Sequence, residues 1–387
     1  MAKKNTFLRV ILWIVGILVV LCAALALIWR GEIRSMLSVN VAEDNEYLYV
    51  MQYSAPYDLD DLIEKDVDTN ADLLSYVISR VGKGIPLNIT SSQVAPEDGQ
   101  GEDPGEHCTV FQSKNAIEDG YVFGRNYDFY KNPSLVTYSY PKDGYASVAV
   151  SDMSHMGYGL DHLPVSLLSK VNCLAAIYAP LDGINEKGLC TAILALPKMP
   201  AYQDEPSRHS VGTTVLMRLF LDRCATVDEA IELTRKYNIR HDQKAGGGYH
   251  YMVADAAGNC AVIEFDPQDG WKTMVVAKDT AKNHMLVTNH LLSPKYFSPV
   301  PDPRVGNINS HSWWRYAVVD SVLTANKGML TVPAAAQTLS AVHWKDLVWE
   351  DGTVEDTQYS AVYDQRNLSL TLRSWKNYED KEYFFVL

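Results

Sequence analysis

The stretch PEDGQGEDPGEHCTVFQSK, residues 96–114, joins two segments of opposite character. Its first part is rich in glycine, proline and acid, with five acidic residues and no lysine or arginine before Cys108. From Cys108 onward the residues are apolar and typical of a β-strand. The junction therefore predicts either a domain boundary beside an incidental buried cysteine, or a site at which the chain is cut.

The composition indicates a globular protein. Of the 387 residues, 47% are hydrophobic and 10% aromatic, which is ample for a core. The length fits two average domains or one large α/β or α+β domain. A formal net charge of −13 argues against a nucleic-acid partner, because phosphate binding requires a clustered basic face that this sequence lacks.

The N-terminus carries the clearest local signal. A basic tail, residues 1–9, precedes an unbroken apolar run over residues 10–29, which matches the roughly 20 residues needed to cross a bilayer. We expect an uncleaved transmembrane anchor with a cytoplasmic tail and an extracytoplasmic catalytic domain. Two alternatives stay open: a signal peptide cleaved after Ala24-Leu25-Ala26, which would give a secreted protein, and a lipoprotein signal ending at Cys22.

The cysteines single out one position. Five of the six lie outside the apolar run, and an odd number cannot all form disulfides with one another. Three sit in apolar contexts typical of small buried side chains. Cys108 differs because it directly follows the polar run. The five are Cys108, Cys173, Cys190, Cys224 and Cys260.

The remaining pattern predicts an α+β protein. A preceding segment, residues 30–107, holds a strand at 46–53, one or two amphipathic helices over 58–81, and the acidic linker 91–107. The domain over residues 108–387 alternates runs of strands with pairs of helices, which favours antiparallel sheets covered by helices. Helices are expected at 212–224, 227–237, 313–324 and 334–342, the second opened by a Thr226-x-x-Glu229 capping box, and strands at CTVFQS, YVFGRNYDF, SLVTYSY, ASVAV, VNCLAAIYA, GLCTAILAL, YHYMVADA, NCAVIEF, HMLVTN, QYSAVYD, LSLTLRS and EYFFVL.

Five segments in fixed order resemble the choloylglycine hydrolase family: Cys108, GRNYDF at 124–129, DGINEKGL at 182–189, YHYMVADAAGNCAVIE at 249–264 and VTN at 287–289. That family includes bile salt hydrolases and penicillin V acylases, and is similar to the acid ceramidase and N-acylethanolamine amidase group. The resemblance implies an N-terminal-nucleophile hydrolase with an αββα four-layer sandwich, here preceded by one transmembrane helix. It implies cleavage of a linear amide in a small N-acyl substrate, with no cofactor or metal.

The chemistry of such a hydrolase explains the cut. An amide hydrolase without a metal needs a nucleophile, a base and an oxyanion stabiliser. If Cys108 begins the mature chain, its own α-amine, with a reference pKa of about 7.7 to 8, can accept the thiol proton. In the encoded chain that nitrogen is an amide and cannot act as a base. The mechanism therefore requires autocatalytic cleavage between His107 and Cys108, where an exposed linker can be opened.

The other site residues follow from the resemblance. Arg125 and Asp128 lie 17 and 20 positions after Cys108, a spacing at which a hairpin returns the chain beside it. The resemblance implies that Arg125 stabilises the thiolate and Asp128 orients the α-amine; the alternative is a surface ion pair. It makes Asn289 the oxyanion-hole amide, the alternative being a turn asparagine. The second donor would be the backbone N–H of Ala195, where bile salt hydrolases have asparagine, so bile-salt specificity is in question.

Two further residues depart from the pattern or fall outside it. Arg315 lies later than the family's late arginine, and two roles stay open: support of the site after a shift of about one helical turn, or pairing at the surface. Asp255 is interpreted as a hairpin-turn residue, because aspartate followed closely by glycine is ordinary turn chemistry.

Other classes of protein remain as alternatives. A papain-like protease would need a histidine beside the thiol, a non-catalytic membrane-anchored binding domain would need no thiol, and an acyltransferase of the same fold would replace water by an amine. Homo-oligomerisation is left open. The candidate histidines are His155, His162, His250 and His290, and the aromatic residues that could line an acyl pocket are Tyr127, Phe129, Tyr130, Trp313 and Trp314.

Overall fold

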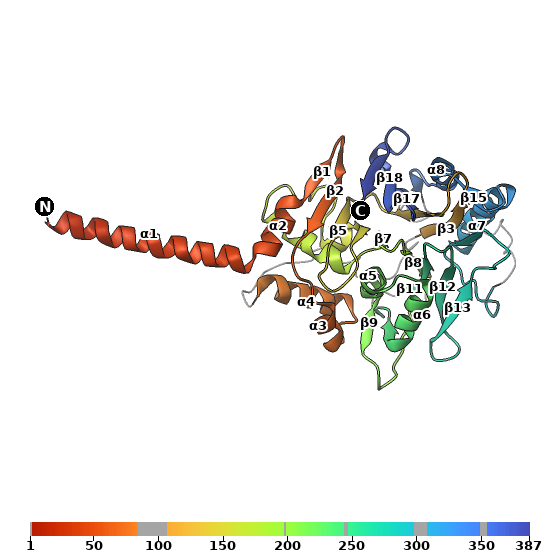
Figure 1. Cartoon of the computed structure of the whole chain (residues 1–387), viewed down its shortest axis with the longest axis horizontal. Coiled ribbons are helices and arrows are strands. Elements are labelled where there is room, and N and C mark those ends of the chain that lie inside the picture. The colour runs from red at the N-terminus through yellow and green to blue at the C-terminus, as the bar shows by residue number, and fades with distance from the viewer. Residues whose placement is uncertain (1, 84–106, 197–198, 244–246, 298–307, 349–353) are drawn as a thin grey trace.

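The computed structural model describes residues 2–83, 107–196, 199–243, 247–297, 308–348 and 354–387. Apart from His107, the acidic linker 91–107 lies outside the described residues. Two large sheets pack face to face and form the body of the molecule (Figure 1). Mixed helix and sheet confirm the predicted α+β class.

One sheet contains nine strands among the described residues. Its strands pair antiparallel except for β2 and β5, which run parallel. In spatial order they are β1 (Asn40–Ala42), β2 (Asn45–Tyr53), β5 (Ser134–Ser139), β6 (Ser147–Asp152), β7 (Asp182–Asn185), β8 (Cys190–Leu196), β11 (Gly248–Ala254), β12 (Cys260–Asp266) and β13 (Lys272–Ala277).

The other sheet is built around the β3–β4 hairpin. The glycine that opens GRNYDF is required here, because a Cβ at Gly124 would lie 2.7 Å from the Phe111 ring on the neighbouring strand. The order in the described residues is β14 (His284–Val287), β3 (His107–Asn115), β4 (Tyr121–Phe129), β17 (Val354–Asp364), β18 (Ser369–Ser374) and β19 (Tyr383–Val386), with β15 (Met329–Leu330) on β3 and β16 (Leu347–Val348) on β17.

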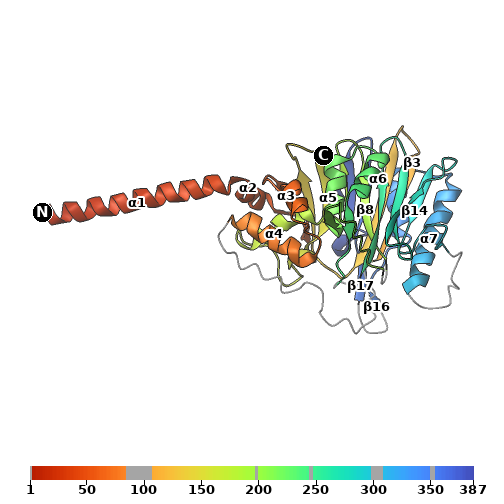
Figure 2. The same cartoon turned by 90° about the horizontal axis from the view of Figure 1, so that it is seen from below.

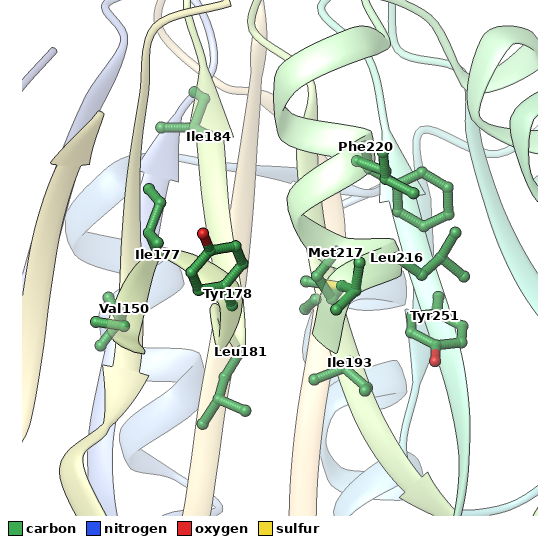
Figure 3. Close-up of a cluster of buried hydrophobic side chains, with 14 of the residues drawn as sticks. Val150, Ile177, Tyr178, Leu181, Ile184, Ile193, Leu216, Met217, Phe220 and Tyr251 are labelled. Carbon is green, nitrogen blue, oxygen red and sulfur yellow. The ribbon is translucent and has the colours of Figure 1, made fainter. Parts of the chain in front are cut away.

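Helices cover the outer faces of both sheets. On the nine-stranded sheet lie α5 (Thr213–Arg223) and α6 (Val227–Lys236), and on the other lies α7 (Ile308–Ala325) (Figure 2). The helix α8 (Val332–Ser340) packs on β17 and β4 of that second sheet. Leu216, Met217 and Phe220 of α5 pack near Ile193 and Tyr251 of the sheet beneath (Figure 3). The result is the αββα layering that the resemblance implies.

The segment before Cys108 is joined to the larger sheet. It contains α2 (Arg30–Ser38), β1, β2, α3 (Leu59–Glu64) and α4 (Asn70–Gly82). β2 pairs with β5 from Leu48 opposite Ser134 to Tyr53 opposite Ser139. Several of its apolar side chains belong to the main core, with Leu48, Met51 and Leu62 fully buried. The proposed boundary at Cys108 therefore falls inside one hydrogen-bonded body.

The first helix stands away from this body. α1 (Ala2–Ile28) projects as a rod (Figure 1). Its window Ile11–Ile28 has a mean hydropathy of 3.1 and is 0% buried, so by length and composition it can cross a membrane.

The expected strand over VNCLAAIYA is wrong. This stretch lies in a 3₁₀ helix, η2 (Ser169–Tyr178), whose start is held by the Ser166 hydroxyl accepting from the Ser169 N–H. A short continuous apolar run fits a buried strand and a buried helix equally well, so periodicity could not separate them.

The bounds of other elements also differ from those expected. α7 begins at Ile308, ahead of its expected start at residue 313. The capping box at Thr226 and Glu229 is present. Elements that we did not expect include α2, β1, β7, β9 (Ser210–Gly212), β10 (Asn238–Arg240), β13, η1 (Met153–Met156) and η3 (Trp375–Asn377).

Candidate active site

Cys108 lies where the two sheets face each other. It is the second residue of β3, fully buried, and its Sγ is 3.9 Å from the Ile193 carbonyl oxygen of β8 in the opposite sheet. None of the six cysteines, all of which lie in the described ranges, forms a disulfide. The residue that follows the acidic run is therefore a thiol enclosed by the body of the protein.

Arg125 lies beside this thiol. β3 and β4 pair with Val110 opposite Arg125 and Cys108 opposite Tyr127, which puts these side chains on one face of the sheet. The Arg125 Nη2 donates to the Cys108 Sγ at 3.4 Å. Burial opposes the charge on Arg125, but the neighbouring Tyr359, Cys108 and Asp182 outweigh it and raise the pKa of Arg125. A buried, permanently charged guanidinium therefore adjoins the sulfur and would favour its thiolate form. The surface ion-pair alternative is wrong.

Asp182 holds Arg125 in place, and sequence reasoning missed this role. Its carboxylate is 3.2 Å from the Arg125 Nε and accepts hydrogen bonds from the hydroxyls of Tyr359 and Tyr363. Burial raises the pKa of Asp182, while Arg125 and the two hydroxyls oppose the rise. Asp182 opens the quoted DGINEKGL segment, so the available signal was an acid in a recognised motif.

Asn289 bridges several groups of the site. It lies two residues after β14, almost fully buried, and its Oδ1 accepts from the Cys108 N–H at 2.8 Å and from the Arg315 Nη2 at 2.8 Å. Its Nδ2 donates to the Ala195 carbonyl at 2.8 Å. An amide nitrogen carries two hydrogens, so the Nδ2 can also donate toward a reacting oxygen beside Cys108.

Ala195 turns its backbone toward the same place. The Ile193 N–H donates to the Leu181 carbonyl at 3.0 Å, so the polar groups of Ile193 face β7 rather than β11. Alternation along a strand puts the N–H and C=O of Ala195, two residues later, on that same side. The N–H predicted as an oxyanion donor thus shares an edge of β8 with the carbonyl that Asn289 contacts.

Arg315 is part of the site, and the surface-pairing alternative is wrong. It is fully buried on α7 and donates to the Cys108 carbonyl, to the Thr109 Oγ1 at 3.0 Å and to Asn289. Burial lowers the pKa of Arg315, opposed by Asp128, Cys108 and Glu355. Arg315 lies on one face of α7, a helix that covers the sheet, so it can fix the backbone of Cys108 and the side chain of Asn289 together.

Asp128 lies on the opposite face of the sheet from the thiol. It is paired with His107, and neighbours along a strand alternate between faces. Its Oδ1 accepts from the Thr357 hydroxyl at 2.6 Å, while its buried Oδ2 has no hydrogen-bond partner among the described residues. Burial raises the pKa of Asp128 to about 6, against the effects of Arg315 and Thr357. A carboxyl poised near neutrality thus adjoins the start of β3.

His107 is held firmly at the position of the expected cut. Its ring is buried, 3.2 Å from the Glu355 Oε2 and beside the Trp344 ring at 4.9 Å between centroids. Burial, together with Arg315 and His311, holds the pKa of His107 well below its usual range, so the ring is neutral near pH 7. The peptide bond between His107 and Cys108 therefore starts a fixed strand.

The other candidates are distributed differently. His250 and His290 both contact Thr288, at its carbonyl and its Oγ1 respectively. Trp313 stacks on His290 at 3.7 Å, whereas Trp314 is 46% exposed. Among the aromatic residues proposed to line an acyl pocket, Tyr127 contacts Phe129, and Phe129 contacts Tyr130. Asp255 accepts from the N–H groups of Ala257 and Asn259, as expected of a turn residue.

Comparison with known proteins decides the family. A family model described as acyl-coenzyme A:6-aminopenicillanic acid acyl-transferase matches residues 116–377, more than half of the chain. The chain belongs to this family. The resemblance drawn from Cys108 and the four segments after it is thereby confirmed. The chain is also similar to a penicillin V acylase from Pectobacterium atrosepticum, with 29% identity over 116 residues. That match spans 28% of this chain and 29% of the relative, so it covers under a third of the relative's length.

Solved structures show a similar fold. The C2A mutant of a conjugated bile acid hydrolase from Clostridium perfringens superposes with a TM-score of 0.52 at 15% identity, over 72% of this chain and 92% of that one. The R18L variant of the same hydrolase gives a TM-score of 0.52 at 16% identity with the same coverage. At such identities the likeness concerns the fold alone.

Proposed function

We propose that this family member hydrolyses a linear carbon–nitrogen amide in a small N-acyl substrate, with Cys108 as an N-terminal nucleophile. The observation that carries the proposal is the convergence of three buried groups on one residue. Arg125 contacts the sulfur of Cys108, Asn289 its nitrogen and Arg315 its carbonyl. A cysteine that is buried only as part of the core packing would not require two buried guanidinium groups beside it.

The chain would first be cut before Cys108. The thiol attacks the His107 carbonyl carbon, the peptide C–N bond breaks as its nitrogen takes up a proton, and water hydrolyses the resulting thioester. We infer that the Asp128 carboxyl, which is paired with His107 across the β3–β4 hairpin, supplies that proton. The cut leaves an α-amine on Cys108, next to its present partner Asn289, and Asp128 would then orient it.

Turnover would use the same groups. The α-amine takes the thiol proton, and the thiolate, favoured by Arg125, attacks the substrate carbonyl. Donors on Asn289 and on the Ala195 backbone stabilise the oxyanion. The C–N bond breaks as the ammonium returns its proton to the leaving amine, and water, deprotonated by the amine, releases the acid from the thioester.

We also propose that the enzyme is anchored to a membrane through α1, with the catalytic domain outside the cytoplasm. The apolar window of α1 is 0% buried, and a soluble protein has no use for such a surface. Where this helix ends, the Trp29 indole donates to the Val81 carbonyl and Lys83 pairs with Glu32 at 2.7 Å. These two contacts connect the C-terminal end of α4 to the chain that directly follows α1. Cleavage of α1 as a signal peptide is the alternative.

A second function has a specific observation in its favour. The description of the matching family names an acyl-transferase, and the same thioester would yield to an amine in place of water. The two outcomes differ only in the acceptor. Offering the enzyme an N-acyl substrate with and without a primary amine, and identifying the acyl product by mass spectrometry, separates hydrolysis from transfer.

The direct test uses the full chain in detergent and a panel of N-acyl amides with different acyl groups. Cys108→Ala should fold and lack activity, and Cys108→Ser should keep a small residue of it, because a hydroxyl is a poorer nucleophile near neutral pH. Alkylation of Cys108 with iodoacetamide should abolish turnover. Full activity in a folded Cys108→Ala protein would overturn the proposal. A non-catalytic binding domain would instead bind its ligand equally well before and after alkylation of Cys108.

A further inference from the structure

Two polar residues of the YHYMVADAAGNCAVIE segment have no part in the mechanism above. His250 on β11 and Glu264 on β12 are both fully buried in the nine-stranded sheet, and the His250 Nδ1 is 3.4 Å from the Glu264 Oε1. Buried carboxylates are retained at a cost in desolvation, and both oxygens of this one are occupied. The hydrogen-bond partners of His250 and Glu264 indicate which part of the chain these two side chains hold in position.

Their partners lie in the loop that follows β14 of the other sheet, on both sides of Asn289. The His250 Nε2 is 2.9 Å from the Thr288 carbonyl, an acceptor only, so this nitrogen carries the proton and donates. The Glu264 oxygens accept from the N–H groups of Leu292 and Ser293 at 2.6 and 2.9 Å. The residue before Asn289 and the turn after it are thus both tied to the opposite sheet.

A separate contact fixes the same turn from the helix side. The Thr288 Oγ1 lies 2.9 Å from the Ser312 Oγ and 3.2 Å from the His290 Nδ1, and His290 stacks on Trp313. Burial lowers the pKa of His290 to about 3, so it stays neutral and adds no charge. These contacts hold the turn from the helix side, whereas His250 and Glu264, together with the bond from Asn289 to the Ala195 carbonyl, tie it to the sheet that carries Ala195.

We infer that His250 and Glu264 are positioning residues that hold Asn289 between Cys108 and Ala195. The inference rests on the proposed function, because it assigns how the oxyanion donor is aimed. Asn289 must span two elements of different sheets, contacting Cys108 of β3 and Ala195 of β8. A shift of about 1 Å in such a donor can lower a rate by roughly 100-fold.

The test compares matched variants of the full chain. His250→Leu removes the donor to Thr288, and Glu264→Gln replaces one acceptor oxygen by an N–H donor; each should lower kcat by about 10- to 100-fold with KM within about threefold. His250→Gln, whose amide nitrogen reaches a similar position, should restore kcat to within about threefold of wild type. Iodoacetamide should alkylate Cys108 at the wild-type rate in all three, because the contact of Arg125 with the thiol is untouched.

Asp255→Asn is the control. This carboxylate also accepts backbone N–H groups, from Ala257 and Asn259 on the β11–β12 hairpin and from Val227 at the start of α6, and it lies at the opposite end of β11 from His250. It should lower stability and leave kcat unchanged. Wild-type kcat in folded Glu264→Gln would overturn the inference, as would equal losses in the two His250 variants. If His250→Leu does not fold, Glu264→Gln decides.

Failure of the proposed function is recognised separately. In that case wild-type turnover would itself be absent or indifferent to Cys108 alkylation. Hydrogen exchange then still tests the positioning: residues 288–293 should exchange faster in Glu264→Gln than in wild type or Asp255→Asn. Unchanged protection would refute the assignment without reference to activity.

Discussion

The backbone nitrogen of Cys108 donates to the side-chain oxygen of Asn289 at 2.8 Å, although 181 positions separate the two residues. The contact joins the nitrogen that would become the catalytic base to the amide that would stabilise the oxyanion. Both groups are buried, so their relative position is fixed before any substrate binds.

Replacement of Asn289 by Ala should lower kcat by roughly 100-fold or more with little change in KM, because its amide would act mainly on the transition state. Steady-state kinetics on the processed enzyme measure this. Asn185→Ala is a matched control, since that buried amide donates only to the Leu221 and Cys224 carbonyls in the described structure and should affect stability alone. A loss confined to KM would assign Asn289 to substrate positioning.

Asp182→Asn should destabilise the protein by about 3 to 5 kcal/mol, because it leaves the buried Arg125 without its carboxylate. Tyr359→Phe removes only one hydroxyl donor to Asp182 and should lower the free energy of unfolding by about 1 kcal/mol. Urea unfolding of both variants measures the difference. Equal losses would mean that Asp182 acts as a neutral hydrogen-bond acceptor rather than as the counter-ion of Arg125.

Asp128→Asn should stabilise the folded protein at pH 8 and have little effect near pH 3.5. The folded-state pKa of about 6 lies above the reference value of 3.8, so the unfolded chain loses this proton first and wild-type stability falls as pH rises through that window. Above pH 6 the penalty is of the order of 2 to 3 kcal/mol. Unfolding at the two pH values tests it, and a pH-independent difference would contradict the assignment.

The same substitution should abolish turnover while raising stability. Amidase activity of the cut enzyme should decline on the acid side of its pH profile, as Asp128 is protonated and no longer holds the α-amine as a carboxylate. A pH–activity profile measures this decline, which is the acid limb of the profile. An acid limb retained in a catalytically active Asp128→Asn protein would assign the titration to another group.

The two pieces made by cleavage before Cys108 should stay together on the membrane. β2 pairs with β5 along six residues, and Leu48 and Met51 are fully buried in the common core. Membrane fractionation with mass spectrometry should find both fragments in one complex, and Met51→Asp should release the larger one. A Cys108-started fragment free in the medium would refute retention, and an intact, active full-length chain would refute the cleavage.

Much of this site could be predicted from short motifs. The β3–β4 hairpin follows from chain spacing, so the approach of Arg125 to Cys108 was accessible. The role of Asp182 was not, because its tyrosine partners lie 177 and 181 positions away on β17. Nor could the sequence distinguish the faces of β4, and only the register with His107 places Asp128 on the far side from the thiol.

The surroundings of Asn289 were less predictable still. His250 and Glu264 lie in a quoted motif, but their contacts cross from one sheet to the other. No local pattern reports which strand ends meet across a sandwich. The helix η2 shows the same limit on a smaller scale, because its buried face is decided by the elements packed around it rather than by the order of its own residues.

The position of β2 has a consequence for making the enzyme. Without residues 30–107, β5 would become an outer strand, and the backbone groups of Ser134–Ser139 that face β2 would lose their partners. An uncovered apolar strand of this kind is a template for aggregation. A catalytic chain expressed from Cys108 alone should therefore precipitate, and co-expression of the upstream segment should keep it in solution.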